Sequence, residues 1–161
     1  MSPLLISWQY ERTSLFMVAE KGDAAMVKQL LAAKASTAAK RNNGQTPLHA
    51  AAYSDQLECA TLLLDAKADI DARGDNGQGA LHFTAYMNYG EMTELLVKRK
   101  AKMTFTDTVG NTPLHMAGIA NGHLAAKHLV KAGANKSAKN DAGQTPLDVA
   151  SNTNEVYEYL K

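Results

Sequence analysis

Four stretches of the chain place apolar residues at the three- and four-residue spacing of one helix face. They read MVKQLLAA from residue 26, ECATLLLDA from residue 58, MTELLVKR from residue 92 and AAKHLVKA from residue 125. This spacing predicts helices that bury one side. The stretches between them are polar and contain glycine, as in KADIDARGDNGQ from residue 67, and they predict tight β-turns.

The pattern returns with a fixed period. GQTPLHAAAYSDQ from Gly44 recurs as GNTPLHMAGIANG from Gly110 and GQTPLDVASNTNE from Gly143, with a weaker copy, GQGALHFTAYMNY, from Gly77. A second series has the same step of 33 residues: Ala35, Ala68, Ala101 and Ala134. Two independent series with one period indicate a repeat protein, because a catalytic site would be needed only once.

Each unit carries the signals for two short helices. Thr46 is suited to cap a helix with its hydroxyl, and Pro47 fits the first helical position because its missing N–H has no partner there. Nine residues after each threonine position stands a residue type that tolerates a positive φ, which predicts a tight turn into a second, antiparallel helix. These turn residues are Gly22, Asp55, Asn88, Asn121 and Asn154.

The unit resembles the ankyrin repeat, whose pattern runs as T-P-L-H-x-A-A, a turn, an aliphatic second helix, then Gly-Ala and a loop rich in aspartate. The resemblance covers residues 11–161 and implies an all-α solenoid of antiparallel helix pairs with β-turn fingers. We expect one domain over residues 1–161, with a flank at 1–10 and repeats at 11–40, 41–73, 74–106, 107–139 and 140–161. For function, the resemblance implies binding of another protein or a peptide.

The departures from the family pattern lie mostly in the end repeats and the third repeat. Ser14 and Phe16 stand in place of proline and histidine in the first repeat, and Asp148 replaces histidine in the last, which predicts caps at both ends. Gly79 and Ala80 replace Thr-Pro in the third repeat, so we expect it to be the least stable interior unit. Lysine replaces the family's glycine after three second helices, at Lys34, Lys67 and Lys100, whereas Gly133 keeps it.

Composition and charge narrow the class of function. Of the 161 residues 45% are apolar, and the formal charge of +1 gives no overall field that would attract nucleic acid or an anionic membrane. No stretch approaches the ~20 apolar residues of a membrane span, and the first residues do not read as a signal peptide. A single cysteine, Cys59, favours a reducing compartment. We expect a monomer in the cytoplasm or nucleus.

The candidate catalytic and metal-binding residues favour architecture over chemistry. His49, His82 and His115 recur once per repeat, about 10 Å apart by the thickness of packed helices, which is too far for two of them to share a metal. The family resemblance implies that this imidazole forms hydrogen bonds within and between repeats. His123 and His128 are five residues apart with no evident third ligand, and the cysteine is predicted to be buried. With no nucleotide-binding or hydrolase motif, we expect no enzyme activity, cofactor or metal.

A candidate binding surface follows from the resemblance. In ankyrin repeats the seventh and eighth residues after the threonine face a concave groove beside the finger tips and vary with the partner. They place Tyr53, Tyr86 and Ile119 in a row, with Met87 beside it, as an interface centre would require. The finger residues that would rim the groove are Asn42, Asn43, Asp75, Asn76, Thr108 and Val109. The alternative is that the two tyrosines only cover the seam between helices.

Other surfaces and other functions stay open at this point. KRKAK at residues 98–102, together with the lysine series, offers either a positive edge for an acidic partner or an ordinary solvated surface. The chain could also be a regulatory or inhibitory subunit of an enzyme complex, or a structural section of a longer repeat array. Trp8, in the apolar start MSPLLISWQY, would pack on the first repeat or, in the last case, on a preceding repeat.

Overall fold

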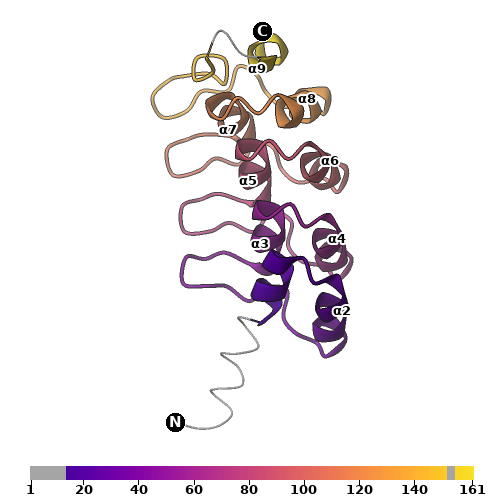
Figure 1. Cartoon of the computed structure of the whole chain (residues 1–161). Helices are drawn as coiled ribbons and strands as arrows, with labels where there is room; N and C mark the ends of the chain where they lie inside the picture. The colour runs from indigo at the N-terminus through magenta and orange to yellow at the C-terminus, as the bar shows by residue number, and fades with distance from the viewer. Residues whose placement is uncertain (1–13, 152–154) are drawn as a thin grey trace.

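The computed structural model describes residues 14–151 and 155–161 as a stack of antiparallel helix pairs (Figure 1). Residues 14–21 are helical. The labelled helices that follow are α2 (Ala24–Ala32), α3 (Pro47–Tyr53), α4 (Leu57–Asp65), α5 (Ala80–Tyr86), α6 (Gly90–Lys98), α7 (Pro113–Ile119), α8 (His123–Lys131) and α9 (Glu155–Leu160). The described residues contain no strand, and the predicted all-α solenoid is confirmed.

The helices form two columns and the fingers project beside one of them. In Figure 1 the first helices α3, α5 and α7 stack in one column, the second helices α2, α4, α6 and α8 in the other, and the fingers extend from the side of the first helices. The first helices have seven residues and the second helices nine. Helices of two turns are unstable alone, so packing between repeats must hold them.

The turn between the two helices of a repeat has the predicted left-handed residue. Asp55, Asn88 and Asn121 have φ values of 55°, 58° and 57°, and Gly22 has 78°. The predicted turn residue Asn154 lies outside the described residues, as do Trp8 and the threonine position of the first repeat.

The residue that ends each second helix is also left-handed. Lys34, Lys67 and Lys100 have φ values of 62°, 65° and 66°, where Gly133 has 89°. A side chain in this conformation costs on the order of 1 kcal/mol, and a cation at a helix C-terminus recovers about 0.3 to 1 kcal/mol of it. Three lysines are therefore tolerated at a position that favours glycine.

Each finger closes with a hydrogen-bonded turn and is joined to the next finger. In the first finger the Arg41 N–H donates to the Gln45 carbonyl and the Gly44 N–H donates to the Arg41 carbonyl, both at 2.9 Å. The Asp75 N–H of the second finger donates to the Asn43 carbonyl at 2.9 Å. Gly44 is required there, because its φ is +74° and a Cβ atom would lie 2.9 Å from the Asp75 nitrogen. The equivalent finger-to-finger bonds are Thr108 to Asn76 and Asp141 to Val109.

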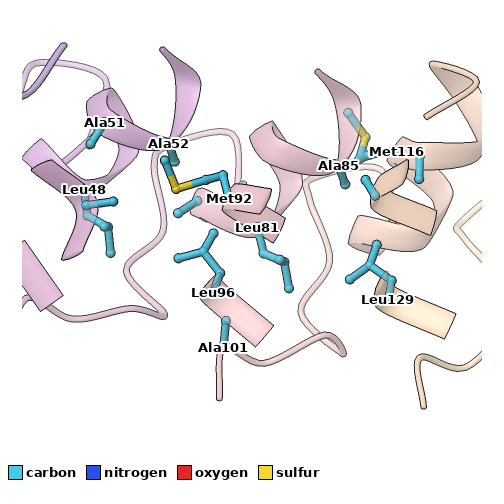
Figure 2. Packing of buried hydrophobic residues seen from close by; sticks show 14 of the residues in the cluster. Leu48, Ala51, Ala52, Leu81, Ala85, Met92, Leu96, Ala101, Met116 and Leu129 are labelled. Carbon is cyan, nitrogen blue, oxygen red and sulfur yellow. The ribbon is translucent and has the colours of Figure 1, made fainter. Parts of the chain in front are cut away.

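One continuous apolar core runs through the stack (Figure 2). Leucines from the first and second helices fill it, with alanines between them that let the helices approach closely. The leucines that are fully or almost fully buried are Leu15, Leu48, Leu63, Leu81, Leu96, Leu114, Leu129 and Leu160. We call these residues the leucine column. Burying each leucine contributes about 1.5 to 3 kcal/mol, so the leucine column supplies much of the stability that short helices lack.

The third repeat differs from its neighbours by a buried pair of hydroxyls. Thr84 and Thr93 are fully buried, and the Thr93 hydroxyl donates to the Thr84 oxygen at 3.1 Å. The Thr84 hydroxyl donates to the Leu81 carbonyl at 3.2 Å. The same positions are alanines in the second and fourth repeats, Ala51 with Ala60 and Ala117 with Ala126. The two threonines of this repeat thus give each other the hydrogen bond that a buried hydroxyl needs.

The last repeat departs from the predicted helix pair. A first helix was expected from Thr145 and Pro146, but residues 146–149 form only turns. The Val149 N–H reaches the Thr145 carbonyl at 3.2 Å, and the next bond, from Ala150 to Leu147, already has the shorter turn spacing. Short helices are marginal without tertiary packing, and this segment carries Asp148 where α3, α5 and α7 carry histidine.

Ala80→Pro is expected to raise the free energy of unfolding by about 0.5 to 1 kcal/mol, because proline reduces the freedom of the unfolded chain. Pro47 and Pro113 hold the same first helical position, and Gly79 has the extended backbone (φ −99°, ψ 176°) that a residue before proline prefers. Urea denaturation measures the change. Pro113→Ala is the matched control and should lower stability by a similar amount; a loss of stability in both variants would contradict the prediction.

Candidate functional site

The recurring histidine joins each repeat to the next. The Thr46 N–H donates to His49 Nδ1 at 3.1 Å, so Nδ1 is unprotonated and the proton lies on Nε2. Nε2 then donates to the Gln78 carbonyl in the following repeat at 3.3 Å. His82 and His115 repeat this arrangement, receiving the N–H of Gly79 and Thr112 and donating to the carbonyls of Asn111 and Gln144. The implied hydrogen bonds within and between repeats are confirmed.

Burial favours the neutral form of His49 and His82, and hydrogen bonds occupy both nitrogens of each ring. Burial lowers the pKa of His49 from 6.5 to about 4, against the smaller opposite effect of the Gln78 carbonyl. Burial also lowers the pKa of His82. Both ring nitrogens of each residue are bonded to backbone groups, so neither is open to act as a base or as a metal ligand.

The threonine before His49 has a different partner from the predicted one, whereas the threonine before His115 also forms the predicted bond. The sequence suggested that the Thr46 hydroxyl would accept a backbone N–H at the helix start, but it has no such bond and lies 2.9 Å from His49 Nδ1 instead. Because Nδ1 is unprotonated, the hydroxyl donates to it. The Thr112 hydroxyl lies 2.8 Å from His115 Nδ1 and also receives the His115 N–H at 3.4 Å. One hydroxyl can thus donate to the imidazole and accept the backbone N–H at the same time, as Thr112 does.

Asp148 forms the local hydrogen bonds that histidine forms in the preceding repeats. One carboxylate oxygen receives both the Thr145 N–H at 2.8 Å and the Thr145 hydroxyl at 2.7 Å, which are the two bonds that Nδ1 receives elsewhere. These bonds lower the pKa of the carboxyl group. Aspartate therefore supplies the local acceptor but has no equivalent of the Nε2 proton, which the three histidines donate to a backbone carbonyl of the next repeat.

The remaining candidates for chemistry are either paired or inaccessible. His123 Nε2 lies 3.3 Å from a Glu155 oxygen, and no three of the histidines, cysteines and acidic residues in the described ranges come together as a metal ion would require. Cys59 is buried as predicted, and burial raises the pKa of its thiol, which disfavours the reactive thiolate.

The predicted row consists of the last residues of three consecutive first helices. Tyr53 ends α3, Tyr86 ends α5 and Ile119 ends α7, and their exposed fractions are 51%, 48% and 46%. We call these three residues the first-helix row. Met87 follows Tyr86 and is half-buried. Each row residue has the same place on its helix, so the repeat itself aligns them.

Tyr53 combines exposure with a contact across the seam between repeats. Its ring meets the edge of Phe83 in the next repeat, with ring centroids 5.9 Å apart and planes at 83°. Phe83 makes a similar contact with His49, also at 5.9 Å. Sequence reasoning missed Phe83, although it lies three residues before Tyr86, the spacing of one helix face. Tyr53 therefore covers part of the seam while half of its surface remains open.

The predicted finger residues are exposed at the tips. Val109 is the most exposed large apolar residue among those described, at 55%, and Asn42, Asn43, Asp75, Asn76 and Thr108 are exposed as well. Two of these side chains stabilise their own turns. Asn43 Oδ1 receives the Gln45 N–H at 3.2 Å, and Asn76 Oδ1 receives the Gln78 N–H at 3.1 Å. Such bonds are typical of asparagine in turns, so these two side chains are only partly available to a ligand.

The stack of helix pairs with hydrogen-bonded fingers defines a repeat solenoid whose repeats interlock through histidine. The family model for ankyrin repeats (3 copies) matches residues 4–74 and 81–161, so the chain belongs to the ankyrin repeat family. A search of curated proteins found no match. Ankyrin repeats generally serve as protein-interaction modules. None of the helices in the described ranges has the length and apolar character needed to cross a membrane.

His115→Ala is expected to lower the free energy of unfolding by about 1 to 3 kcal/mol, because it leaves the N–H of the buried Thr112 without its acceptor and removes one of the two hydrogen bonds that the Gln144 carbonyl receives. Binding through the first-helix row should persist. Urea denaturation and a binding titration on the same preparation measure the two effects. Unchanged stability together with lost binding would contradict the structural role of the ring.

Stability is expected to fall as the pH drops from 6.5 towards 4. The unfolded chain protonates His49 below pH 6.5, but the folded chain does so only near pH 4, so the contribution is fully present above 6.5 and is lost through this window. One such group changes the free energy of unfolding by about 1.4 kcal/mol per pH unit. Denaturation curves between pH 7.5 and 4.5 measure the slope.

The matched variant for this slope is His49→Asn. It should reduce the slope, since asparagine offers an acceptor oxygen and does not titrate. Equal slopes in the wild type and in His49→Asn would exclude His49 as the source.

Proposed function

We propose that the protein binds another protein, or a peptide segment of one, through the first-helix row and the adjoining finger tips. The observation that carries this proposal is the exposure of large apolar side chains at one equivalent position in three consecutive repeats. Single exposed apolar residues are normal on a protein surface, whereas an aligned set is typical of an interaction site.

The chemistry of the row suits an interface centre. Tyrosine offers a large contact area with few torsions to immobilise, and its hydroxyl can bond a partner's backbone. Met87 and Phe83 extend the apolar area around Tyr86 within the same repeat. Partner residues that cover this area would be mainly apolar, with polar groups facing the asparagine and aspartate side chains of the fingers.

The scaffold supports such a site because its parts are fixed before a partner arrives. The fingers are joined to each other by backbone hydrogen bonds, and the first helices are joined by histidine. A partner therefore needs to order little of this surface, which favours affinity. We propose a monomeric binding module without catalytic activity, acting in the cytoplasm or nucleus; a regulatory subunit of an enzyme complex would use the same surface.

Tyr86→Ala is expected to weaken binding at the row by about 2 kcal/mol or more, roughly thirtyfold, while changing stability little because half of the ring is already exposed. Peptides selected from a random display library against the wild-type protein supply the ligands. Each selected peptide is titrated against the wild type, Tyr86→Ala and a control.

Leu124→Ala is the matched control, because Leu124 is similarly exposed, at 44%, but lies on the second helix α8. It should leave the affinity of the selected peptides unchanged. If most peptides bound Tyr86→Ala as tightly as Leu124→Ala, the row would not be the binding surface. If Tyr86→Ala unfolded the protein, the tyrosine would belong to the core.

A further inference from the structure

A pocket of about 690 Å³ lies between the third and fourth repeats, away from the first-helix row. Its wall is formed by the segment from the end of α6 to the third finger and by the segment that follows α8. We call it the lysine pocket, after Lys100, Lys102 and Lys139, which line it. No aspartate or glutamate lines it, and it shares no residue with the first-helix row.

The repeat provides an internal comparison for this pocket. A smaller pocket of about 470 Å³ occupies the equivalent place two repeats earlier, and there Asp69 and Asp71 lie among its basic residues. In the lysine pocket the position of Asp69 is taken by the neutral Asn135, and that of Asp71 corresponds to Ser137. The acidic groups that balance the earlier pocket are thus absent from the later one.

The lysines of the pocket differ in how far they are neutralised. Lys102 Nζ lies 3.7 Å from Asp71, which also receives the Lys102 N–H at 2.8 Å. Lys100 and Lys139 form no ion pair within the described ranges. The carboxylate of Asp148 interacts electrostatically with Lys139 without forming an ion pair, and it accepts hydrogen bonds from Thr145. Two cations therefore face the pocket without a close counter-ion.

The rest of the wall is apolar. Val97, Ala101, Met103 and Ala134 line the pocket between the lysines. A ligand that fits must combine negative charges with an apolar group, because the cations favour anions and the carbon surface favours a side chain that leaves water. The volume also exceeds what a single phosphate or carboxylate would fill.

We infer that the lysine pocket binds an acidic segment of a partner protein in which carboxylate side chains flank an apolar side chain. The carboxylates reach Lys100 and Lys139, and the apolar side chain lies against Met103 and Val97. No aromatic residue lines the pocket, so it lacks the stacking surface typical of single-stranded nucleic-acid sites. This second surface goes beyond the proposed function of the first-helix row and does not depend on it.

The test uses the whole chain and the labelled peptide EDELEDE, with fluorescence anisotropy as the readout. The wild type should bind it about tenfold or more tightly than the amide peptide QNQLQNQ, because charge is required. EDESEDE should bind about fivefold more weakly than EDELEDE, because the apolar contact is lost. Affinity should also fall as salt rises from 50 to 150 mM.

The variant K100E/K139E should weaken binding of EDELEDE about tenfold or more. K34E/K67E is the matched control, because it makes the same change in net charge at exposed lysines that line neither pocket. It should weaken binding less than about threefold at 150 mM salt. Tyr86→Ala should leave this affinity unchanged even if it abolishes binding at the first-helix row, so the two proposals can fail separately.

Several results would overturn the inference. The first two are a wild type that does not bind EDELEDE and an amide peptide that binds as tightly as EDELEDE. The third is an equal loss of affinity in K100E/K139E and K34E/K67E, which would mean that only the overall charge matters. Sedimentation with phosphatidylcholine vesicles containing phosphatidylserine provides the remaining comparison. Vesicle binding that requires Lys100 and Lys139, without peptide binding, would assign the pocket to a membrane surface instead.

Discussion

The hydrogen bond from each histidine Nε2 to the backbone of the next repeat is the interaction on which the stack depends. It exists only because Nδ1 receives a backbone N–H at the start of the same helix, which fixes the tautomer. One ring thereby couples the start of a short helix to the position of its neighbour. Burial makes protonation of the His49 ring unfavourable and lowers its pKa, so charging the ring costs folding free energy. A chain of two-turn helices becomes one body through this coupling and the leucine column.

This coupling also decides where the sequence can vary. Buried positions repeat closely, because each must fit the same neighbours, whereas the end of each first helix faces outward in every repeat. Tyr53, Tyr86 and Ile119 are therefore aligned by the framework and not by any contact among themselves. The framework fixes the spacing of the row, and the identity of its residues is left to the partner.

Much of the fold follows from the sequence because the repeat reports the same local signals several times. The period, the left-handed turn residues and the buried cysteine could all be predicted from residue types alone. The lost helix at Thr145 could not, since Thr145 and Pro146 give the same start signal as Thr112 and Pro113, and a short helix depends on packing that residue types do not show. The partner of the Thr46 hydroxyl was also missed, because a hydroxyl at a helix start can donate to a side chain as well as accept a backbone N–H, and residue types alone do not show which bond forms.

The site was predicted less completely than the fold, for a related reason. Phe83 contacts residues of the preceding repeat, and the lysine pocket joins segments of two different repeats, so neither is visible within one unit. The repeat nevertheless allows each unit to serve as a reference for the others. At Thr84 and Thr93 two departures in the core satisfy each other inside the chain. Asn135, in contrast, does not supply the negative charge that Asp69 gives to the earlier pocket, and Lys100 and Lys139 form no ion pair within the described residues. Comparing units in this way separates a polar group that the chain itself satisfies from a charge that remains available to a ligand.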